Sequence, residues 1–167
     1  LSEVLEKTLD IDGILELAGE APELAAPETE MLIQKDTAFG YRTEEKVRIG
    51  VADDEAFCFF YADNLNLLEQ MGAELVRFSP IHDRELPEDL DGLLLSGGYP
   101  ELNGEALEEN QEMCTRIREV IRDGMPCLAE CGGFMYLHQE MEDMEGKQRR
   151  VCGVIPGKAY RRPKLNR

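Results

Sequence analysis

The chain has 167 residues, of which 43% are apolar and 32% charged, and its 35 acidic side chains outnumber 18 basic ones to give a net charge of −17. This surplus argues against nucleic acid as a partner, because phosphate binding needs clustered lysine and arginine. No apolar run approaches the roughly 20 residues that a membrane-spanning helix needs, so no membrane contact is expected.

The first 45 residues divide into a helical part and an acidic part. Residues 1–19 are expected to be helical, with Asp10 as the N-cap of a second short helix. Residues 20–45 are acidic, contain proline and carry few large apolar side chains, which is typical of a linker.

From residue 46 onward the pattern changes to alternating strands and helices. Residues 46–52 predict a strand. The apolar run at residues 56–62 then predicts the start of a helix, with Asp54 as its N-cap and Gly72 as its C-terminal stop.

The rest of the chain continues this alternation. We expect strands at residues 74–78, 91–96, 126–130 and 151–157, and helices at residues 103–123 and 132–141. Short connections between such elements predict an α/β fold with an open, mostly parallel sheet and helices on both faces. Ligands of these sheets bind at the carboxyl ends of the strands, where the two most unusual loops of this sequence lie.

One of these loops is A-E-C-G-G at residues 129–133, where a predicted strand runs straight into a predicted helix. Cys131 stands at the junction with small residues two positions before and two after it, as a nucleophile elbow requires. A helix N-terminus also favours the thiolate, the reactive form of cysteine. The pattern predicts Cys131 as a catalytic nucleophile, and a small buried cysteine beside a glycine turn is the alternative.

The other loop is S-G-G-Y-P-E at residues 96–101, which contains Gly97 and Gly98. Glycine lets the backbone approach a ligand closely with its N–H groups exposed. Paired with the N–H of Gly132, a donor in this loop would bind the oxyanion of a tetrahedral intermediate. We predict these three glycines as substrate-binding residues, and an ordinary turn is the alternative.

A cysteine hydrolase also needs a base within hydrogen-bond reach of the thiol. His138 follows Cys131 by seven residues, which is about 10 Å along a helix and too far. His82 follows the second predicted strand, where a local role such as pairing with Asp83 is the simpler interpretation. The base is therefore expected beyond Arg167, with His82 as the alternative.

The cysteine pattern argues against disulfides and metal. Five cysteines occur, an odd number without C-x-x-C spacing, which favours a reducing cytoplasm. Zinc usually needs closely paired ligands, and no G-x-x-x-x-G-K-[ST] phosphate loop is present. Asp53, Asp54 and Glu55 suggest a Mg²⁺ site, but a solvated loop is the simpler interpretation. No metal or cofactor is predicted within this sequence.

The segment from Lys147 to Arg167 reverses the charge of the chain, with eight basic and no acidic residues. A solvated tail is one interpretation. A surface that meets a polyanionic substrate or the rest of a longer chain is the other.

Residues 54–110, the segment A-E-C-G-G-F-M-Y-L and the segment G-V-I-P-G resemble the cobyrinic acid a,c-diamide synthase family, CobB/CobQ-type enzymes of cobalamin biosynthesis. The resemblance runs from about residue 47 to residue 157. It implies a partial, flavodoxin-like class I glutamine amidotransferase domain at residues 46–167. Residues 20–45 then match the interdomain linker, and residues 1–19 match the tail of an N-terminal ATP-dependent synthetase domain.

In the chemistry that the resemblance implies, a cysteine matching Cys131 hydrolyses glutamine, with Gly98 and Gly132 as the oxyanion hole. Ammonia then passes to the synthetase domain, where ATP and Mg²⁺ activate the a and c carboxylates of a corrinoid. The catalytic histidine of the family lies beyond this chain. The fragment is therefore expected to be C-terminally incomplete and inactive, with exposed apolar edges or a homo-oligomer.

Three alternatives stay open. A nickel-sirohydrochlorin a,c-diamide synthase shares the architecture and differs in the tetrapyrrole. A flavodoxin-like binding module would carry no chemistry at Cys131. A cysteine peptidase or redox domain would hydrolyse or oxidise a different substrate.

Overall fold

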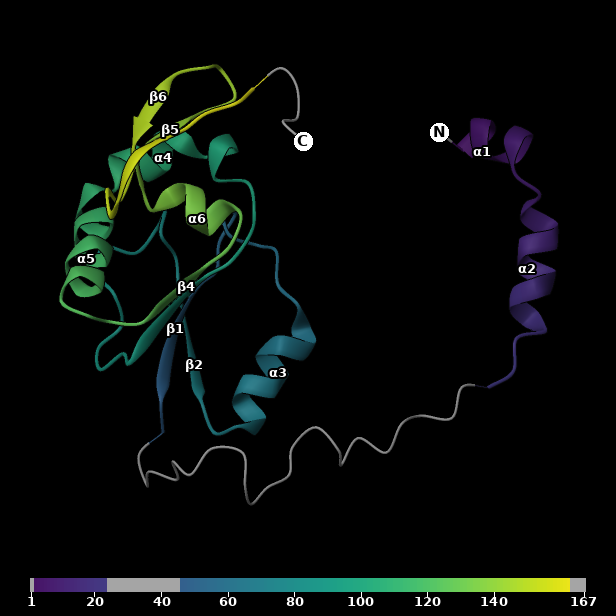
Figure 1. The fold of residues 1–167 in the computed structure, drawn as a ribbon, viewed down its shortest axis with the longest axis horizontal. Coiled ribbons are helices and arrows are strands. Elements are labelled where there is room, and N and C mark those ends of the chain that lie inside the picture. The colour runs from purple at the N-terminus through teal and green to yellow at the C-terminus, as the bar shows by residue number, and fades with distance from the viewer. Residues whose placement is uncertain (1, 24–45, 163–167) are drawn as a thin grey trace. The chain divides into compact units, whose positions relative to one another are not determined.

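The structure is a computed structural model that describes residues 2–23 and 46–162 (Figure 1). The chain divides between residues 41 and 42 into two units. The linker predicted at residues 20–45 lies outside the described residues from residue 24 onward.

The first unit contains two short helices, α1 (Ser2–Thr8) and α2 (Ile11–Gly19), as predicted. The Asp10 carboxylate accepts a hydrogen bond from the N–H of Gly13 at 3.0 Å, which confirms its role as N-cap. Neither helix buries a residue, and Leu17 is 72% exposed. Residues 2–23 therefore form no packed core. Isolated helices of this length are only marginally stable in water.

Four parallel strands form the main sheet in the order β2-β1-β3-β4. They are β1 (Arg48–Ala52), β2 (Glu74–Phe78), β3 (Gly92–Leu95) and β4 (Cys127–Ala129). This sheet confirms the predicted open, parallel α/β architecture. Its central strands carry the core, because Val51, Leu93 and Leu95 are 3% exposed or less. The outer strand β4 differs, since its Leu128 side chain is 60% exposed.

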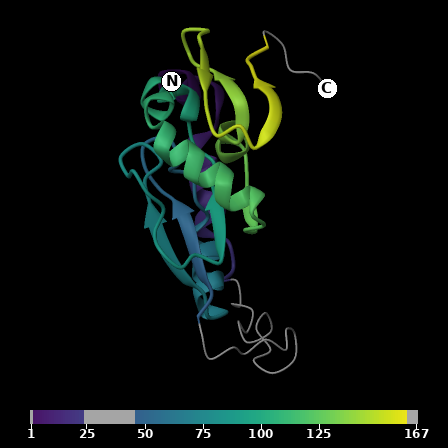
Figure 2. The ribbon, with the colours of Figure 1, turned by 90° about the vertical axis from the view of Figure 1, so that its left-hand side faces the viewer.

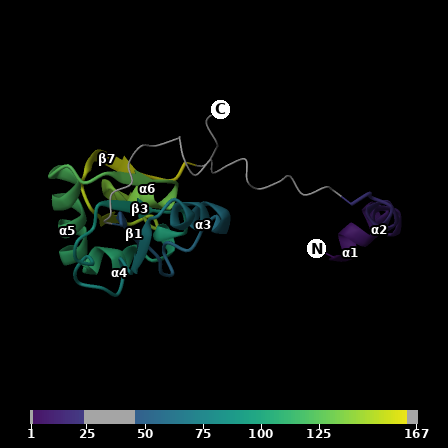
Figure 3. The ribbon, with the colours of Figure 1, turned by 90° about the horizontal axis from the view of Figure 1, so that it is seen from below.

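Helices cover both faces of this sheet. In Figures 1 and 3, α3 (Ala62–Gln70) and α5 (Gln111–Arg122) lie on opposite sides of the strands. Gly72 and Gly124 follow these helices with φ values of 103° and 104°. Glycine adopts this left-handed conformation without steric cost, so both residues end their helices as predicted.

The chain leaves two neighbouring strands in opposite directions along the sheet. β1 leads to β2 on one side, whereas β3 leads through α4 and α5 to β4 on the other. Such a switch point opens a crevice at the carboxyl ends of the two strands, which is where open α/β sheets bind ligands. The two unusual loops of the sequence, at residues 96–101 and 129–133, lie at this edge of the sheet.

A second, smaller sheet follows α6 (Gly132–Tyr136) and was not predicted. Its strands are β5 (His138–Glu142), β6 (Gln148–Arg150) and β7 (Ile155–Ala159), in the order β6-β5-β7. β5 pairs with β6 antiparallel and with β7 parallel. Figures 1 and 2 place this sheet beyond the carboxyl ends of the main strands.

The helix predicted at residues 132–141 and the strand predicted at residues 151–157 are therefore wrong in extent. α6 ends after five residues, and the chain then enters β5. The apolar run F-M-Y-L lies in α6 and its C-cap, whereas residues 138–142 pair with β6 and β7 and so form a strand. The buried Met141 between polar neighbours shows the alternation of a half-buried strand.

Arg149, which is buried, fastens the second sheet to α4 (Gly104–Glu109). Its Nε donates a hydrogen bond to the Asp143 carboxylate at 2.7 Å, and its Nη1 donates one to Glu108 at 3.3 Å. The bond from Arg149 lowers the pKa of Asp143, and the backbone N–H of Arg150 lowers the pKa of Glu108. Both carboxyls thus stabilise the fold above their unfolded pKa values, and this stabilisation is lost as pH falls through the folded values.

The long helix predicted after the glycine-rich loop is interrupted at Asn110, which is 2% exposed. The Asn110 Oδ1 accepts a hydrogen bond from the N–H of Met113 at 3.4 Å and so caps α5. Its Nδ2 donates to the carbonyls of Pro80 and Asp83 at 2.9 and 2.7 Å. One buried side chain therefore joins α5 to the loop that follows β2.

Replacement of this side chain should weaken the fold. We expect Asn110→Ala to lower the free energy of unfolding by about 1–3 kcal/mol, because a helix cap is lost and buried carbonyls lose their donor. Urea denaturation followed by circular dichroism measures the difference. The matched control is Asn66→Ala on the exposed face of α3, which should leave stability nearly unchanged. Equal stability of the two variants would contradict this role for Asn110.

Candidate active site

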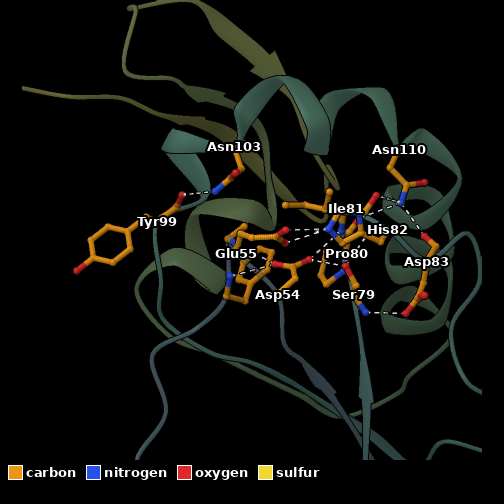
Figure 4. A network of polar contacts seen from close by, with 12 residues as sticks. Asp54, Glu55, Ser79, Pro80, Ile81, His82, Asp83, Tyr99, Asn103 and Asn110 are labelled. Carbon is orange, nitrogen blue, oxygen red and sulfur yellow. Dashed lines mark hydrogen bonds and ion pairs between the residues drawn. The ribbon is translucent and has the colours of Figure 1, made fainter.

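A polar network holds the loops at the carboxyl edge of β1 and β2 (Figure 4). The Asp54 Oδ1 accepts hydrogen bonds from the N–H groups of Ala56 and Phe57 at 2.9 and 3.2 Å. Its Oδ2 accepts from the Ser79 hydroxyl at 2.8 Å and from the N–H of Ile81 at 2.9 Å. Asp54 therefore ties the end of β1 to the loop after β2.

This network corrects the predicted helix start at residues 56–62. Asp54 closes a turn there and caps no helix, and α3 begins only at Ala62. Residues 54–57 form a bend, and Phe59 then makes a single antiparallel bridge to the glycine-rich loop, because its N–H donates to the Gly97 carbonyl at 3.1 Å. This segment brings aromatic side chains to the edge of the sheet, at residues where a helix was predicted.

Cys131 lies where β4 turns into α6, and its side chain is exposed. Its φ of 47° and ψ of −108° are an uncommon conformation for a residue with a side chain. Gly133 permits this turn, since a Cβ there would stand 2.1 Å from the carbonyl oxygen of Leu95. The sharp strand-to-helix turn that the sequence predicted is present, and the alternative of a buried cysteine is excluded.

Gly98 and Gly132, from two different loops, lie side by side. A Cβ at Gly132 would stand 3.2 Å from the Gly98 nitrogen and 2.8 Å from Pro100 Cδ. Among the described residues, neither glycine N–H donates a hydrogen bond to a protein acceptor. The structure thus brings two available backbone donors together next to Cys131.

Gly97 lies next to Cys131, and the side chain of Phe59 lies beside Gly97 as well. A Cβ at Gly97 would stand 3.5 Å from Phe59 Cβ and 3.7 Å from Cys131 Cβ. The sequence analysis missed Phe59 because it assigned residues 56–62 to a helix. The aromatic run F-C-F-F-Y was the available signal, since aromatic residues favour extended structure.

The histidines are held by other groups. The Nε2 of His82 lies 3.0 Å from both carboxylate oxygens of Glu55, where Asp83 was the predicted partner. The Nδ1 of His138 lies 2.9 Å from the Phe134 carbonyl. Within the described residues, no hydrogen bond or ion pair joins either ring to Cys131.

The acidic residues after β1 point to three different partners. Asp53 pairs with Arg77, Asp54 holds backbone N–H groups, and Glu55 pairs with His82. No group of three side chains within residues 2–23 and 46–162 is arranged to hold a metal ion. These residues therefore do not fit an ATP–Mg²⁺ site.

The comparison with known proteins defines the class of this chain. The model of the CobB/CobQ-like glutamine amidotransferase domain matches residues 48–166. This match covers more than half of the chain and includes Cys131 together with all three glycines. The chain belongs to the CobB/CobQ-like glutamine amidotransferase family.

Several curated relatives carry the names of particular synthases. A cobyrinate a,c-diamide synthase of Dehalococcoides mccartyi is 41% identical over 163 residues, which are 98% of this chain and 34% of that protein. The cobyrinate a,c-diamide synthase of Methanosarcina acetivorans is 48% identical over 84% of this chain and 27% of its own length. A hydrogenobyrinate a,c-diamide synthase of Pseudomonas aeruginosa is 42% identical over 96% of this chain and 38% of its own length. The chain spans about a third of the length of these relatives.

Of the described helices, none is long and apolar enough to cross a membrane.

The ion pair between His82 and Glu55 gives a measurable titration. Glu55 raises the pKa of His82 through a hydrogen bond and through its charge. We expect the His82 ring protons, followed by NMR, to titrate above the ordinary midpoint near 6.5. Glu55→Gln should lower that midpoint, whereas replacement of the exposed Glu85 by Gln should not, because Glu85 does not contribute to the shift.

The sign of the stability effect follows from the same shift. A raised folded pKa means that the pair stabilises the fold below the unfolded value and loses this effect as pH rises through the folded value. A His82 midpoint that ignores Glu55→Gln would contradict the pairing.

Proposed function

We propose that this chain is the glutamine-hydrolysing part of an enzyme that converts tetrapyrrole carboxylates to amides. The observation that carries the proposal is the exposed Cys131 at a sharp strand-to-helix turn, beside two backbone N–H groups without protein acceptors. An acyl-transfer nucleophile needs this combination of an accessible thiol and preorganised donors. Membership of the amidotransferase family supplies the substrate class.

In the proposed first step, the Cys131 thiolate attacks the side-chain carboxamide carbon of glutamine. Negative charge develops on the carboxamide oxygen, and the N–H groups of Gly98 and Gly132 stabilise it. The C–N bond then breaks, and the nitrogen takes up a proton and departs as ammonia. A γ-glutamyl thioester remains on Cys131. Water attacks this thioester in the second step and releases glutamate, which regenerates the thiolate.

The proton transfers need a general base, and the described residues offer none beside the thiol. His82 is engaged by Glu55, and His138 is turned towards the Phe134 carbonyl. We therefore place the base in polypeptide other than residues 2–23 and 46–162. We propose that this base is the catalytic histidine that the resemblance implies.

The acceptor chemistry belongs to the remainder of a longer enzyme. The names of the relatives support cobyrinate or a related corrinoid as acceptor, with its a and c carboxylates as the groups amidated. We place ATP and Mg²⁺ in a synthetase domain whose tail includes α1 and α2. The absence of a buried residue on α1 and α2 supports this assignment, because such helices need a packing partner. The exposed Leu128 on β4 favours association, either with more of the same protein or with a second copy.

The proposal predicts selective alkylation of one thiol. At about pH 9, where an ordinary thiol is largely ionised, a diazo-ketone analogue of L-glutamine should form an adduct on Cys131. Mass spectrometry of the intact chain and of its peptides locates the adduct. Cys58 is the matched control, because it is the other exposed cysteine among the described residues.

Cys131→Ser should abolish the adduct, and Cys58→Ser should not. The D-enantiomer of the analogue should react far more slowly than the L-enantiomer. Equal labelling of the two cysteines, or equal rates for the two enantiomers, would instead favour a binding module without chemistry at Cys131.

The chain alone should turn over glutamine very slowly. Loss of one member of a catalytic triad costs about 10³-fold or more, so we expect glutamate release at least that far below the rate of a full-length relative. The cobyrinate a,c-diamide synthase of Methanosarcina acetivorans is a suitable reference. Rapid glutamate release by the 167-residue chain that disappears in Cys131→Ser would show that a base within the chain has been overlooked.

A further inference from the structure

We propose that Phe59 is a substrate-positioning residue whose ring forms the apolar wall along which the glutamine side chain reaches Cys131. This inference rests on the proposed function and adds a specificity determinant to it. Three observations support it: a shared space above Gly97, a rigid attachment of Phe59 to the turn at Cys131, and the exposure of its ring.

The shared space lies where a side chain at Gly97 would be. The Cβ and Cδ1 atoms of Phe59 stand 3.5 and 3.6 Å from the position of a Cβ at Gly97, and Cys131 Cβ stands 3.7 Å from it. All three atoms lie around the position that a Cβ of Gly97 would take. The side chains of Phe59 and Cys131 therefore lie on the same side of the Gly97 backbone. A ligand that reaches the sulfur through this space contacts the phenyl ring.

Phe59 is fixed to the site through its backbone and through its neighbours. Its N–H donates to the Gly97 carbonyl at 3.1 Å, and the Tyr99 N–H donates to the Ala56 carbonyl at 2.9 Å. Phe57, two residues earlier, is buried and packs on Tyr136 of α6 with the ring centres 5.2 Å apart. The segment is thus attached to the glycine-rich loop and to α6, so the backbone of Phe59 is held in place before any ligand binds.

The ring itself remains open to solvent. Phe59 is 55% exposed, and its only aromatic neighbour in the described residues is Tyr61, which is 60% exposed and meets it edge-on at 5.4 Å. Exposed aromatic side chains at the carboxyl edge of an open α/β sheet are typical of a ligand contact. An aromatic face suits a substrate with an aliphatic chain and a cationic amino group, since it packs on methylenes and attracts the cation. Glutamine has two methylenes next to its carboxamide, and its α-ammonium group lies at the far end of these methylenes.

The test compares two reagents on the same thiol. The rate of Cys131 alkylation by the L-glutamine diazo ketone is divided by the rate for iodoacetamide, which lacks the amino acid part. Phe59→Ala should lower this ratio about tenfold, the usual effect of losing one apolar contact to a substrate. Phe59→Leu should restore most of it. The control is Tyr160→Ala, which removes an equally exposed aromatic ring next to β7 and should leave the ratio unchanged.

A second variant tests the space above Gly97 directly. The nearest atoms to a Cβ there are at ordinary contact distance, so Gly97→Ala should fold normally while it fills the space between Phe59 and Cys131. We expect its ratio to fall as well. If the wild type prefers the glutamine analogue and neither Phe59→Ala nor Gly97→Ala changes the ratio, the role of Phe59 is overturned and the proposed function is not. A wild type that shows no preference for the glutamine analogue would overturn the proposed function and this inference with it.

Discussion

The candidate site depends on the close approach of the first turn of α6 to the end of β3. Gly133 lies against the Leu95 carbonyl with no room for a side chain, and its N–H donates to the carbonyls of Ser96 and Glu130. These two hydrogen bonds help to offset the strained backbone of Cys131, a conformation that costs about 1–3 kcal/mol. The tight turn leaves the thiol on the outside, where a substrate can meet it.

The other parts of the site are arranged around this contact by the order of the strands. β3 lies between β1 and β4, so the glycine-rich loop after β3 meets both the turn at Cys131 and the segment after β1. The Asp54 network holds that segment in a bend, so it does not start a helix there. The proposed nucleophile, the two backbone donors and the proposed aromatic wall therefore come from three neighbouring strand ends.

Much of this arrangement could be predicted from sequence, because several signals are local. Only a few adjacent residues are needed to recognise the strand β3, which is apolar on both faces. The same holds for the glycines that end α3 and α5 and for the turn at Cys131. The segment at residues 56–59 and strand β5 could not be predicted in this way. The conformation of the first is decided by a hydrogen bond to Gly97, which lies well away along the chain, and that of β5 by pairing with β6 and β7, which the polar sequence of β5 does not indicate. The role of Asn110 as an interruption between two helices was hidden for the same reason, since its partners Pro80 and Asp83 follow β2.

The outer strand β4 is only three residues long, and within the described residues it pairs on one side alone. Its other edge presents backbone donors and acceptors that no described strand pairs, and the Leu128 side chain on one face of this strand is exposed. A polypeptide that extends the sheet there would run directly beside Ala129, two residues before Cys131. Any chain at this border would therefore become part of the rim of the candidate site and would influence which molecules reach the Cys131 sulfur.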